Sequence, residues 1–261
     1  MKINIAGGSG KMGKVHRPVF EVAGHEVIIS GRSSSPSLEE AAAQSDLTIV
    51  SVPIHATEET IRRVAPHCRD MMDFTSVKEF PINSMLSYSK GEVGGLHPLY
   101  GNVPSIAGRT VVYCPTERSG NACEEIVRSL REAGANIKVM NPRAHDRFVN
   151  GELQNARVIL FKTFGLLMAN SGMSVQEAYS LSPPPTKAIL DLLARQSGAE
   201  NDEMYTSMIT HNPSMGKILG SLRNYLKDAH SDQKTPFRIR KWFGENELEE
   251  AQKRAKRLVC F

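Results

Sequence analysis

Short apolar runs alternate with amphipathic stretches through the first part of the chain. The apolar runs predict β-strands over Lys2–Ala6, Glu26–Ser30, Leu47–Val52, Met71–Phe74, Val93–Leu96, Thr110–Tyr113 and Ile137–Met140. Stretches between several of these runs predict helices over Lys11–Ala23, Ser37–Ser45, Thr57–Ala65 and Asn121–Ala133. Strands that alternate with helices at this spacing are typical of βαβ units, so we expect a parallel sheet with both faces covered.

The pattern changes after residue 143, where strand-like runs stop. A long helical stretch covers Ala144–Ala169, interrupted only by Gly151 and Gly165. Further helices are predicted over Ser174–Tyr179, Thr186–Gln196, Asp202–Thr210, Ser214–Lys227 and Glu245–Leu258, with helix breakers at Pro183–Pro185, Gly198, Asn212–Pro213 and His230–Pro236. We therefore predict an α/β domain with a parallel sheet over residues 1–143, followed by an all-α domain over residues 144–261.

The composition, 40% hydrophobic and 23% charged over 261 residues, excludes collagen-like, coiled-coil and wholly disordered chains. A net charge of +4 is too small to indicate a nucleic-acid-binding protein. No apolar run approaches the length of about 18 residues that a membrane span needs, and residues 1–13 do not resemble a signal peptide. We therefore expect a cytoplasmic protein with neither nucleic-acid nor membrane partners.

The four cysteines stand at positions 68, 114, 123 and 260, a spacing that matches neither a CxxC pair nor a zinc site. They are predicted to be reduced, structural thiols, and no metal site is expected. Residues 234–257 are rich in Lys and Arg, which we interpret as the solvated face of an amphipathic helix rather than a site for an anionic partner.

The first predicted strand runs directly into a glycine-rich sequence, Gly8-Ser9-Gly10-Lys11-Met12-Gly13, which opens the next helix. This is the G-x-G-x-x-G pattern in the strand–helix context that a dinucleotide-binding loop requires. Gly8 is expected to permit the tight turn, Gly10 the close approach of a diphosphate, and Gly13 the packing of helix on strand. The helix N-terminus favours the anion. The α/β domain is thus predicted to be a Rossmann-type, dinucleotide-binding domain.

The end of the second predicted strand bears on which dinucleotide is used. An Asp or Glu there would bind the ribose 2′-hydroxyl of NAD, but the sequence reads Ser30-Gly31-Arg32-Ser33. Arg32 can pair with a 2′-phosphate and the serine hydroxyls can donate to it, so NADP is the preferred prediction. The alternative is that Arg32 is an exposed loop residue and that NAD, or both cofactors, are used. Val52 and Pro53 end the third strand and either line the nicotinamide side of the pocket or form an ordinary strand end.

Two further segments, Asp73–Lys78 and Gly94–Gly101, follow short apolar strands. They should therefore open on the same sheet edge as the glycine-rich loop. Together they bring a hydroxyl (Ser76), an ammonium (Lys78) and an imidazole (His97) toward the nicotinamide. A histidine at a sheet edge, followed by a proline and flanked by glycines, is a candidate for proton transfer rather than a purely structural residue.

The D-F-T-S-V-K and H-P-L-Y-G segments, together with the N-terminal G-G-S-G-K-M-G, resemble those of the prephenate dehydrogenase family of tyrosine biosynthesis. His145-Asp146-Arg147 resembles the pair that opens the family's long dimerising helix. Leu181–Pro183, Arg195 and Tyr205 resemble its substrate-binding helix, and Arg238–Gly244 its C-terminal segment in bacterial enzymes. The resemblance covers nearly the whole chain, and no chorismate mutase domain is expected before it.

The resemblance implies oxidative decarboxylation of prephenate to 4-hydroxyphenylpyruvate, with hydride transfer to NADP or NAD, in a homodimer formed through the helical half. His97 matches the histidine that accepts the proton of the C4 hydroxyl, and Ser76 the serine that holds this histidine or the hydroxyl. Lys78 matches a cation that binds the substrate. Arg195 matches the arginine that clamps a carboxylate, and Lys187 falls where relatives often have a second arginine. Prephenate carries two carboxylates, for which arginine is the preferred partner.

One departure lies on the long helix, where relatives commonly have a further histidine. This chain has Asn155-Ala156-Arg157-Val158 in that window, so Asn155 or Arg157 is expected to take over a polar contact. Arg195 and Lys187 are also compatible with exposed positions on an amphipathic helix. Arogenate, the aminated analogue of prephenate, stays an alternative substrate.

Two readings outside the family stay open. The glycine-rich N-terminus also resembles deazaflavin-dependent NADP reductases, although those proteins do not require the His97 segment or a long helical half. A non-catalytic dinucleotide sensor is the alternative from another class. The combination of Ser76, Lys78, His97 and Arg195 favours the dehydrogenase, because a sensor would not need it.

Overall fold

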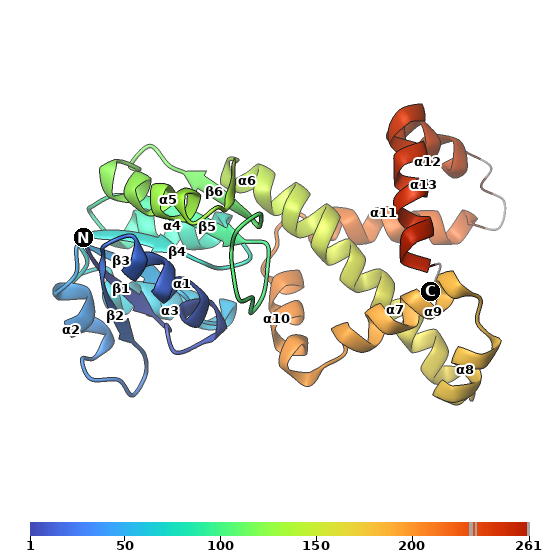
Figure 1. Cartoon of the computed structure of the whole chain (residues 1–261), viewed down its shortest axis with the longest axis horizontal. Helices are drawn as coiled ribbons and strands as arrows, with labels where there is room; N and C mark the ends of the chain where they lie inside the picture. The colour runs from blue at the N-terminus through green and yellow to red at the C-terminus, as the bar shows by residue number, and fades with distance from the viewer. Residues whose placement is uncertain (230–231, 233, 260–261) are drawn as a thin grey trace. The chain divides into compact units, whose positions relative to one another are not determined.

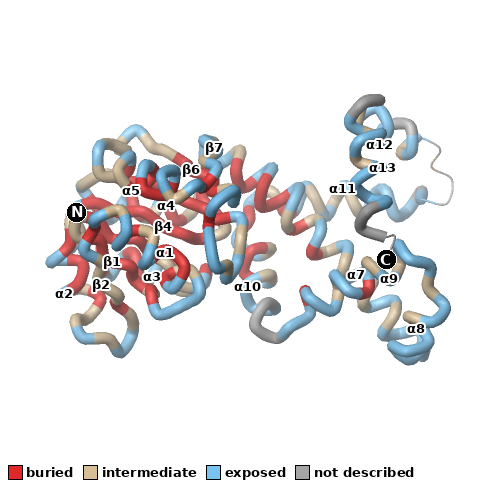
Figure 2. The backbone as a smooth tube through the Cα atoms, in the orientation of Figure 1, coloured by how far each residue is buried: buried red, intermediate tan, exposed pale blue. Residues whose placement is uncertain are grey.

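The computed structural model describes residues 1–229, 232 and 234–259, and the chain divides into two compact units. Unit 1 comprises residues 1–153 and 206–214, and unit 2 comprises the described residues of 154–205 and 215–261. The domain boundary expected after residue 143 falls inside unit 1 and stays a prediction. Figure 2 shows that burial concentrates in the strands of unit 1, whereas the helices of unit 2 are mostly intermediate or exposed.

Unit 1 is built on a seven-stranded sheet in the order β2-β1-β3-β4-β5-β6-β7. The strands are β1 (Lys2–Ala6), β2 (Glu26–Ser30), β3 (Leu47–Val50), β4 (Asp70–Asp73), β5 (Val93–Pro98), β6 (Thr110–Pro115) and β7 (Asn136–Val139). Strands β1 to β5 are parallel, which confirms the predicted α/β class with a mostly parallel, Rossmann-type sheet (Figure 1).

One edge of the sheet departs from the predicted parallel arrangement. β6 pairs antiparallel with β5, and β7 then pairs parallel with β6. A parallel neighbour needs a crossover connection, usually a helix, whereas residues 99–109 between β5 and β6 form a helix-free loop. The chain therefore reverses at this point.

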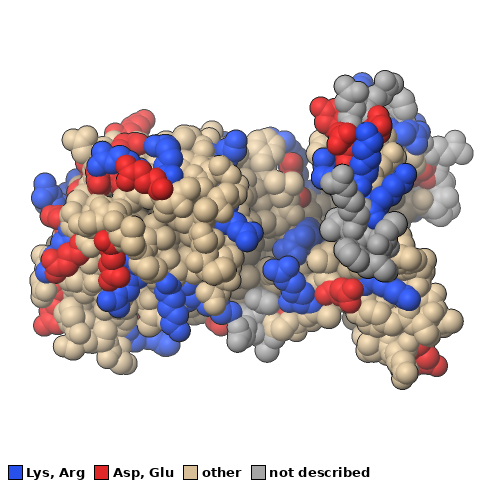
Figure 3. All heavy atoms as spheres, in the orientation of Figure 1, with Lys and Arg blue, Asp and Glu red and all other residues tan. Residues whose placement is uncertain are grey.

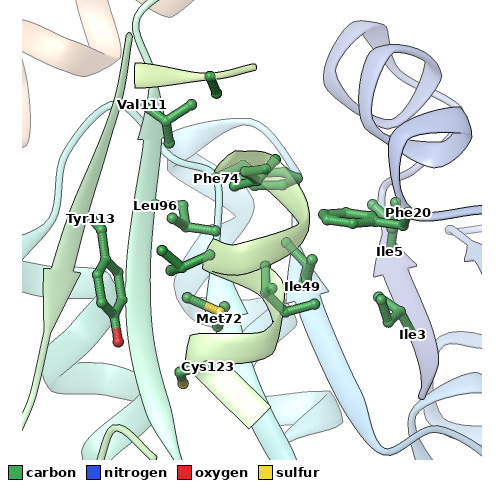
Figure 4. Packing of buried hydrophobic residues seen from close by; sticks show 14 of the residues in the cluster. Ile3, Ile5, Phe20, Ile49, Met72, Phe74, Leu96, Val111, Tyr113 and Cys123 are labelled. Atoms are coloured by element: carbon green, nitrogen blue, oxygen red, sulfur yellow. The ribbon is translucent and has the colours of Figure 1, made fainter. Parts of the chain in front are cut away.

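Two apolar clusters cover the two faces of the sheet. Helices α1 (Lys11–Val22) and α5 (Asn121–Glu132) pack on one face, against a cluster that includes Ile49 and is drawn in Figure 4. Helices α2 (Leu38–Ala43), α3 (Ile54–Val64) and α4 (Glu79–Tyr88) pack on the other face, against a cluster that includes Val50. Successive strand residues point to opposite faces, so β3 contributes to both clusters and is fully buried.

Helix α4 has no counterpart among the predicted elements. Pro81 and the polar residues Asn83, Ser84 and Ser87 obscure its hydrophobic periodicity. Proline is tolerated in the first turn of a helix, and Ile82 and Met85 bury the apolar side of α4 against the sheet. Tertiary packing, rather than local pattern, therefore fixes this helix.

The chain beyond β7 is helical, as predicted. The helices are α6 (Pro142–Ala144), η1 (His145–Asn155), α7 (Ala156–Asn170), α8 (Val175–Leu181), α9 (Pro184–Gln196), α10 (Ala199–Thr210), α11 (Met215–Asp228), α12 (Thr235–Phe243) and α13 (Glu245–Val259). The segment η1 is a π-helix, and neither Gly151 nor Gly165 interrupts the long helical stretch, contrary to expectation. Gly165 instead allows close packing, because a Cβ on it would lie 3.0 Å from Leu193 Cδ1.

Helix α12 begins inside the breaker expected over His230–Pro236, because Pro236 occupies its first turn, where proline is tolerated. Residues 230, 231, 233, 260 and 261, including the expected thiol of Cys260, lie outside the described residues.

No single helix in the described part of the chain is long and apolar enough to cross a membrane. The helix pair Pro142–Asn170 and Val175–Leu181 is long and apolar enough when taken together, but it is bent by 109°. Acidic and basic side chains are interspersed over the face of unit 1 drawn in Figure 3, in keeping with the small net charge.

Candidate functional site

The loop after β1 is shaped by glycines that leave no room for side chains. Gly7 has a φ of 87°, and a Cβ on it would lie 2.4 Å from the Ser51 carbonyl oxygen. Gly7 therefore adopts the left-handed conformation of this turn, one position before the Gly8 of the motif. Gly8 is needed because its Cβ would lie 2.6 Å from Ile29 Cδ1, and Gly13 because its Cβ would lie 2.0 Å from the Gly8 carbonyl oxygen.

This loop leads into an open helix N-terminus. Gly10 is the N-cap of α1 without a side-chain cap, and the first turn contains no acidic residue. Ser9, Gly10 and Lys11 are exposed, and Met12 is half-buried. First-turn N–H groups have no acceptor within their helix and favour a phosphate. The backbone of Gly8–Gly13 therefore fits the diphosphate of a dinucleotide. Gly8 and Gly13 are required in the motif because a Cβ at either position would clash with neighbouring atoms.

The loop after β2 keeps only part of its predicted role. Ser30 is buried and its hydroxyl donates to Asn4 Oδ1 at 2.8 Å, so its one proton is not available to a 2′-phosphate, contrary to expectation. Ser34 orders the loop by accepting from the Gly31 N–H at 2.8 Å. Arg32 and Ser33 are exposed, and within the described ranges no carboxylate pairs with Arg32. A 2′-phosphate would therefore meet Arg32 and Ser33.

Four parallel strands bring the predicted segments to one edge of the sheet. β1, β3, β4 and β5 are successive neighbours, so their carboxyl ends lie side by side. Three inter-strand steps place the end of β5 about 14 Å from the end of β1. Val52 lies beside the glycine-rich loop, because a Cβ on Gly7 would meet Val52 Cγ1 at 2.8 Å, and Pro53 is the N-cap of α3. This edge, where strand order reverses between β1 and β3, is where α/β sheets bind ligands.

At the end of β5, three buried side chains form a hydrogen-bonded chain. His97 Nδ1 lies 2.8 Å from His145 Nε2, and His145 Nδ1 lies 2.8 Å from Asp146 Oδ1. The Asp146 carboxylate also accepts from the backbone N–H groups of Lys78 and Glu79, at 2.8 and 2.9 Å. His145 and Asp146 both begin the π-helix η1, a helix type that is rare and frequent at functional sites.

These contacts fix the protons of the chain. An ionised carboxylate only accepts, so His145 carries its proton on Nδ1 and accepts at Nε2, which requires His97 to donate from Nδ1. Burial lowers the pKa of His97 well below its ordinary value, with further lowering by His145 and Lys78. Burial also lowers the pKa of His145, although its hydrogen bond to Asp146 opposes that shift. His97 is therefore neutral near pH 7, and its Nε2 is left as the acceptor.

Lys78 is buried beside the Asp146–His145–His97 hydrogen-bonded chain and is not exposed. Its fully buried ammonium pairs with Asp73 Oδ2 and donates to the Leu96 carbonyl at 2.8 Å. Thr75 also donates to the same Asp73 oxygen. The expected direct contact of Lys78 with a substrate carboxylate is at odds with this geometry, because its charge is already matched by Asp73. Lys78 instead holds the residue that precedes His97.

Ser76 differs from its prediction in one respect. The partner that holds His97 Nδ1 is His145, not Ser76, since the nitrogen has one proton and donates it to His145. The Ser76 carbonyl accepts from Asn150 Nδ2 at 2.8 Å, and Asn212 Nδ2 donates to Asn150 Oδ1 at 2.6 Å. Backbone bonding therefore fixes the position of Ser76, and its contact with a substrate hydroxyl stays a prediction.

The remaining predicted substrate ligands all lie in unit 2. Arg157 on α7 donates to Gln196 Oε1 at 2.8 Å, and its guanidinium lies 5.9 Å from the centroid of the Tyr205 ring. Lys187 and Arg195 are exposed and lie eight residues apart on α9. Asn155 is buried and donates to Met215 Sδ at 3.3 Å. The substrate-binding role of these cations stays a prediction.

The contacts that His145 and Asp146 make with His97 are not predicted by the sequence, in which the His-Asp pair indicates only the start of a helix. The signal that would have found them is their order: a buried His-Asp dipeptide at a helix start offers an imidazole already oriented by its own neighbour.

Comparison with known proteins decides the family. The profile of "Prephenate dehydrogenase, nucleotide-binding domain" matches residues 23–139. The T-protein of Haemophilus influenzae is 30% identical over 259 residues, which cover 94% of this chain and 67% of that protein. The chain belongs to the prephenate dehydrogenase family. A probable arogenate/prephenate dehydrogenase of Methanocaldococcus jannaschii is 28% identical over 250 residues, which are 87% of this chain. The matched region spans only 56% of that relative's length.

Solved structures of the family share the fold. Prephenate dehydrogenase from Aquifex aeolicus, in complex with hydroxyphenyl propionate and NAD+, aligns with a TM-score of 0.70 at 16% identity, covering 100% of this chain and 98% of that one. Synechocystis arogenate dehydrogenase aligns with a TM-score of 0.65 at 21% identity, covering 98% of both chains. The α/β sheet followed by helices is thus the fold of prephenate dehydrogenases.

Proposed function

We propose that the chain is a prephenate dehydrogenase that prefers NADP and converts prephenate to 4-hydroxyphenylpyruvate and CO2. The observation that carries this proposal is the hydrogen-bonded chain Asp146–His145–His97, at the same sheet edge as the glycine-rich loop. A neutral imidazole with its Nε2 left to accept a proton suits the oxidation of an alcohol, in which a hydride and a proton leave together.

In the proposed reaction, a dinucleotide held by the backbone of Gly8–Gly13 would supply the acceptor for the hydride that leaves C4 of prephenate. The C4 hydroxyl gives its proton to His97 Nε2, and the C4–O bond becomes a carbonyl. His145 and the Asp146 carboxylate stabilise the protonated His97 through the two hydrogen bonds that position it. The bond from C1 to its carboxylate then breaks, CO2 leaves, and the electron pair completes the aromatic ring. The phenolate oxygen takes the proton back from His97.

The same proposal assigns the binding residues. The backbone of Gly8–Gly13 holds the diphosphate, and Arg32 with Ser33 holds the 2′-phosphate. Val52 and Pro53 lie on the nicotinamide side. The fit rests on the glycine positions that a Cβ would fill and on the absence of an acidic residue in the first turn of α1.

Substrate recognition is proposed to use cations of unit 2. Arg195 clamps one carboxylate of prephenate, and Lys187 or Arg157 provides the second cation, for the carboxylate of the pyruvyl side chain. Prephenate is preferred over arogenate because this second cation is available. Ser76 contacts the C4 hydroxyl, whereas Lys78 acts on His97 through the Leu96 carbonyl.

The test is a matrix of initial rates, with prephenate or arogenate as substrate and NADP or NAD as cofactor, followed by the absorbance of the reduced nicotinamide. The proposal predicts the highest kcat/KM for prephenate with NADP. A higher value for arogenate would contradict the substrate assignment. The absence of reduction in all four mixtures would overturn the activity itself.

We also propose that unit 2 forms a homodimer. Helix α7 is mostly apolar, with Arg157 and Lys162 as its charged residues. Its Leu160, Leu166 and Leu167 expose more than half of their side chains. A pocket of 350 Å³, lined mainly by apolar side chains of α7, α8 and α9, adds to this surface. Exposed apolar surface of this kind is typical of an interface.

Light scattering during size-exclusion chromatography tests the dimer. The proposal predicts twice the chain mass of 28.8 kDa for the protein. A Leu166→Glu, Leu167→Glu variant should be monomeric, while Val22→Glu, an exposed position of unit 1, should stay dimeric. A monomeric unmodified protein would contradict the proposal.

A further inference from the structure

We propose that His16 is a positioning residue that ties the glycine-rich loop to the strand end carrying His97. This inference rests on the proposed function and deepens it. His16 lies on α1, one helical turn after Met12, and is fully buried within unit 1. Its ring joins three segments that come together at the carboxyl edge of the sheet: the glycine-rich loop, the end of β4 and the loop after β5.

His16 donates one hydrogen bond and accepts another, each with a different segment. His16 Nδ1 lies 2.8 Å from the Met12 carbonyl oxygen, which only accepts, so His16 donates from Nδ1. Its Nε2 lies 3.0 Å from the Tyr100 hydroxyl. Burial lowers the pKa of His16 to about 4, although the bond to Met12 opposes the shift, so the ring is neutral and Nε2 accepts from Tyr100. The Tyr100 hydroxyl therefore donates to His16, and His16 donates to the Met12 carbonyl in the first turn of α1.

Ring contacts add the third segment. The His16 ring centroid lies 4.4 Å from that of Phe74, and 5.8 Å from that of Tyr100, with the latter pair stacked. Phe74 immediately follows β4 and precedes the Thr75–Ser76 segment, while Tyr100 follows β5 shortly after His97. His16 thus contacts the loop proposed to hold the diphosphate and the two segments that carry Ser76 and His97.

The proposed role of His16 is to align the glycine-rich loop with the strand that carries His97. In the proposed reaction C4 of prephenate must face the nicotinamide and His97 at once, so the loop that holds the cofactor and the strand that carries the base need a fixed relation. A displacement of about 1 Å between reacting groups lowers the rate by about a hundredfold. A single buried ring that bonds to both elements provides that relation.

Two variants separate this role from simple support of the fold. His16→Asn keeps a short amide donor toward the Met12 carbonyl and loses the acceptor for Tyr100. Tyr100→Phe keeps the ring and removes only the hydroxyl, so it carries the test if His16→Asn does not fold. His67→Asn and Tyr88→Phe, both at exposed positions, are the matched controls.

The first readout is hydrogen exchange of the full chain with and without saturating NADP, which does not depend on turnover. NADP should slow exchange at residues 8–14 and at 99–101 in the unmodified protein and in both controls. In His16→Asn and Tyr100→Phe the protection of 8–14 should persist and that of 99–101 should be lost. Equal protection of 99–101 in variants and unmodified protein would overturn the inference.

The second readout is turnover. Both variants should lower kcat for prephenate by about tenfold to a hundredfold, with the NADP Kd from calorimetry close to that of the unmodified protein. A weakened Kd with unchanged kcat would instead show a role in cofactor binding alone and would also overturn the inference. If the unmodified protein does not oxidise prephenate, the proposed function fails, while the exchange experiment still decides the role of His16.

Discussion

Asp146→Asn tests the hydrogen-bonded chain that holds His97. The carboxylate accepts from His145 and from the Lys78 N–H with Oδ1, and from the Glu79 N–H with Oδ2. An amide offers one oxygen and one N–H₂ group, so in either orientation its N–H₂ faces a backbone N–H. If it faces His145, the proton of His145 moves to Nε2 and His97 is left with a proton on its own Nε2, where it cannot accept.

Both orientations remove the negative charge that stabilises protonated His97. Proton transfer by a positioned side chain contributes about 10²–10⁴ in rate, so kcat should fall by that range, or about 3–5 kcal/mol in activation free energy. One buried backbone donor also loses its acceptor, which costs about 1–3 kcal/mol in the free energy of unfolding. A domain stabilised by about 5–15 kcal/mol should stay folded under these conditions.

The assay is kcat for prephenate at saturating NADP, with the thermal unfolding midpoint measured alongside. Asp202→Asn is the control, because Asp202 makes only an exposed ion pair with Lys162 at 3.7 Å and should leave both quantities nearly unchanged. The double variant Asp146→Asn, His97→Asn should be no slower than His97→Asn alone, because the two residues act as a unit. A kcat of Asp146→Asn equal to that of the unmodified protein would refute the reasoning. A fold-loss of kcat in the double variant equal to the product of the two single losses would also refute it.

Further predictions concern the cofactor and pH. Gly13→Ala places a Cβ only 2.0 Å from the Gly8 carbonyl oxygen, so the glycine-rich loop must move. This variant should abolish NADP binding in calorimetry. Arg32→Ala should raise the Kd for NADP by about tenfold to a hundredfold and leave that for NAD unchanged, since a hydrogen bond to a charged group contributes about 1.5–3 kcal/mol. Because burial lowers the pKa of His97 well below 6.5, and the unprotonated form is active, kcat/KM should stay constant as the pH falls through 6.5 and decline only below it. His16 has a pKa of about 4 in the folded chain against 6.5 as the ordinary value, so the unfolded state takes up the proton first. Urea unfolding should therefore show stability lost between pH 6.5 and 4, by about 3 kcal/mol from this residue, and His16→Asn should lack that part of the loss.

Local pattern predicted the elements whose own residues determine them. β1 and β2 have the bounds that their apolar runs predict, and the glycine-rich loop stands between strand and helix as expected. The pairing of β6 was not predictable in this way, because the direction of a strand depends on whether its connection crosses over the sheet. Helix α4 depends on burial against the sheet, which no periodicity of its own residues records.

The candidate site was predicted as a set of residue types, not as a set of contacts. His97 and Lys78 were both singled out, but the sequence does not say that the Lys78 ammonium is buried against Asp73. The partner of His97 lies 48 positions further along the chain, and only the fold brings His145 to it. Ser30 shows the same limit, since its hydroxyl is used by Asn4 on the neighbouring strand.

The most direct test of the account compares NADP reduction by prephenate in the unmodified chain and in His97→Asn. The account predicts turnover in the unmodified chain and a kcat lower by about 10²–10⁴ in the variant, with NADP binding retained. Full turnover in His97→Asn, or none in the unmodified chain, would contradict it.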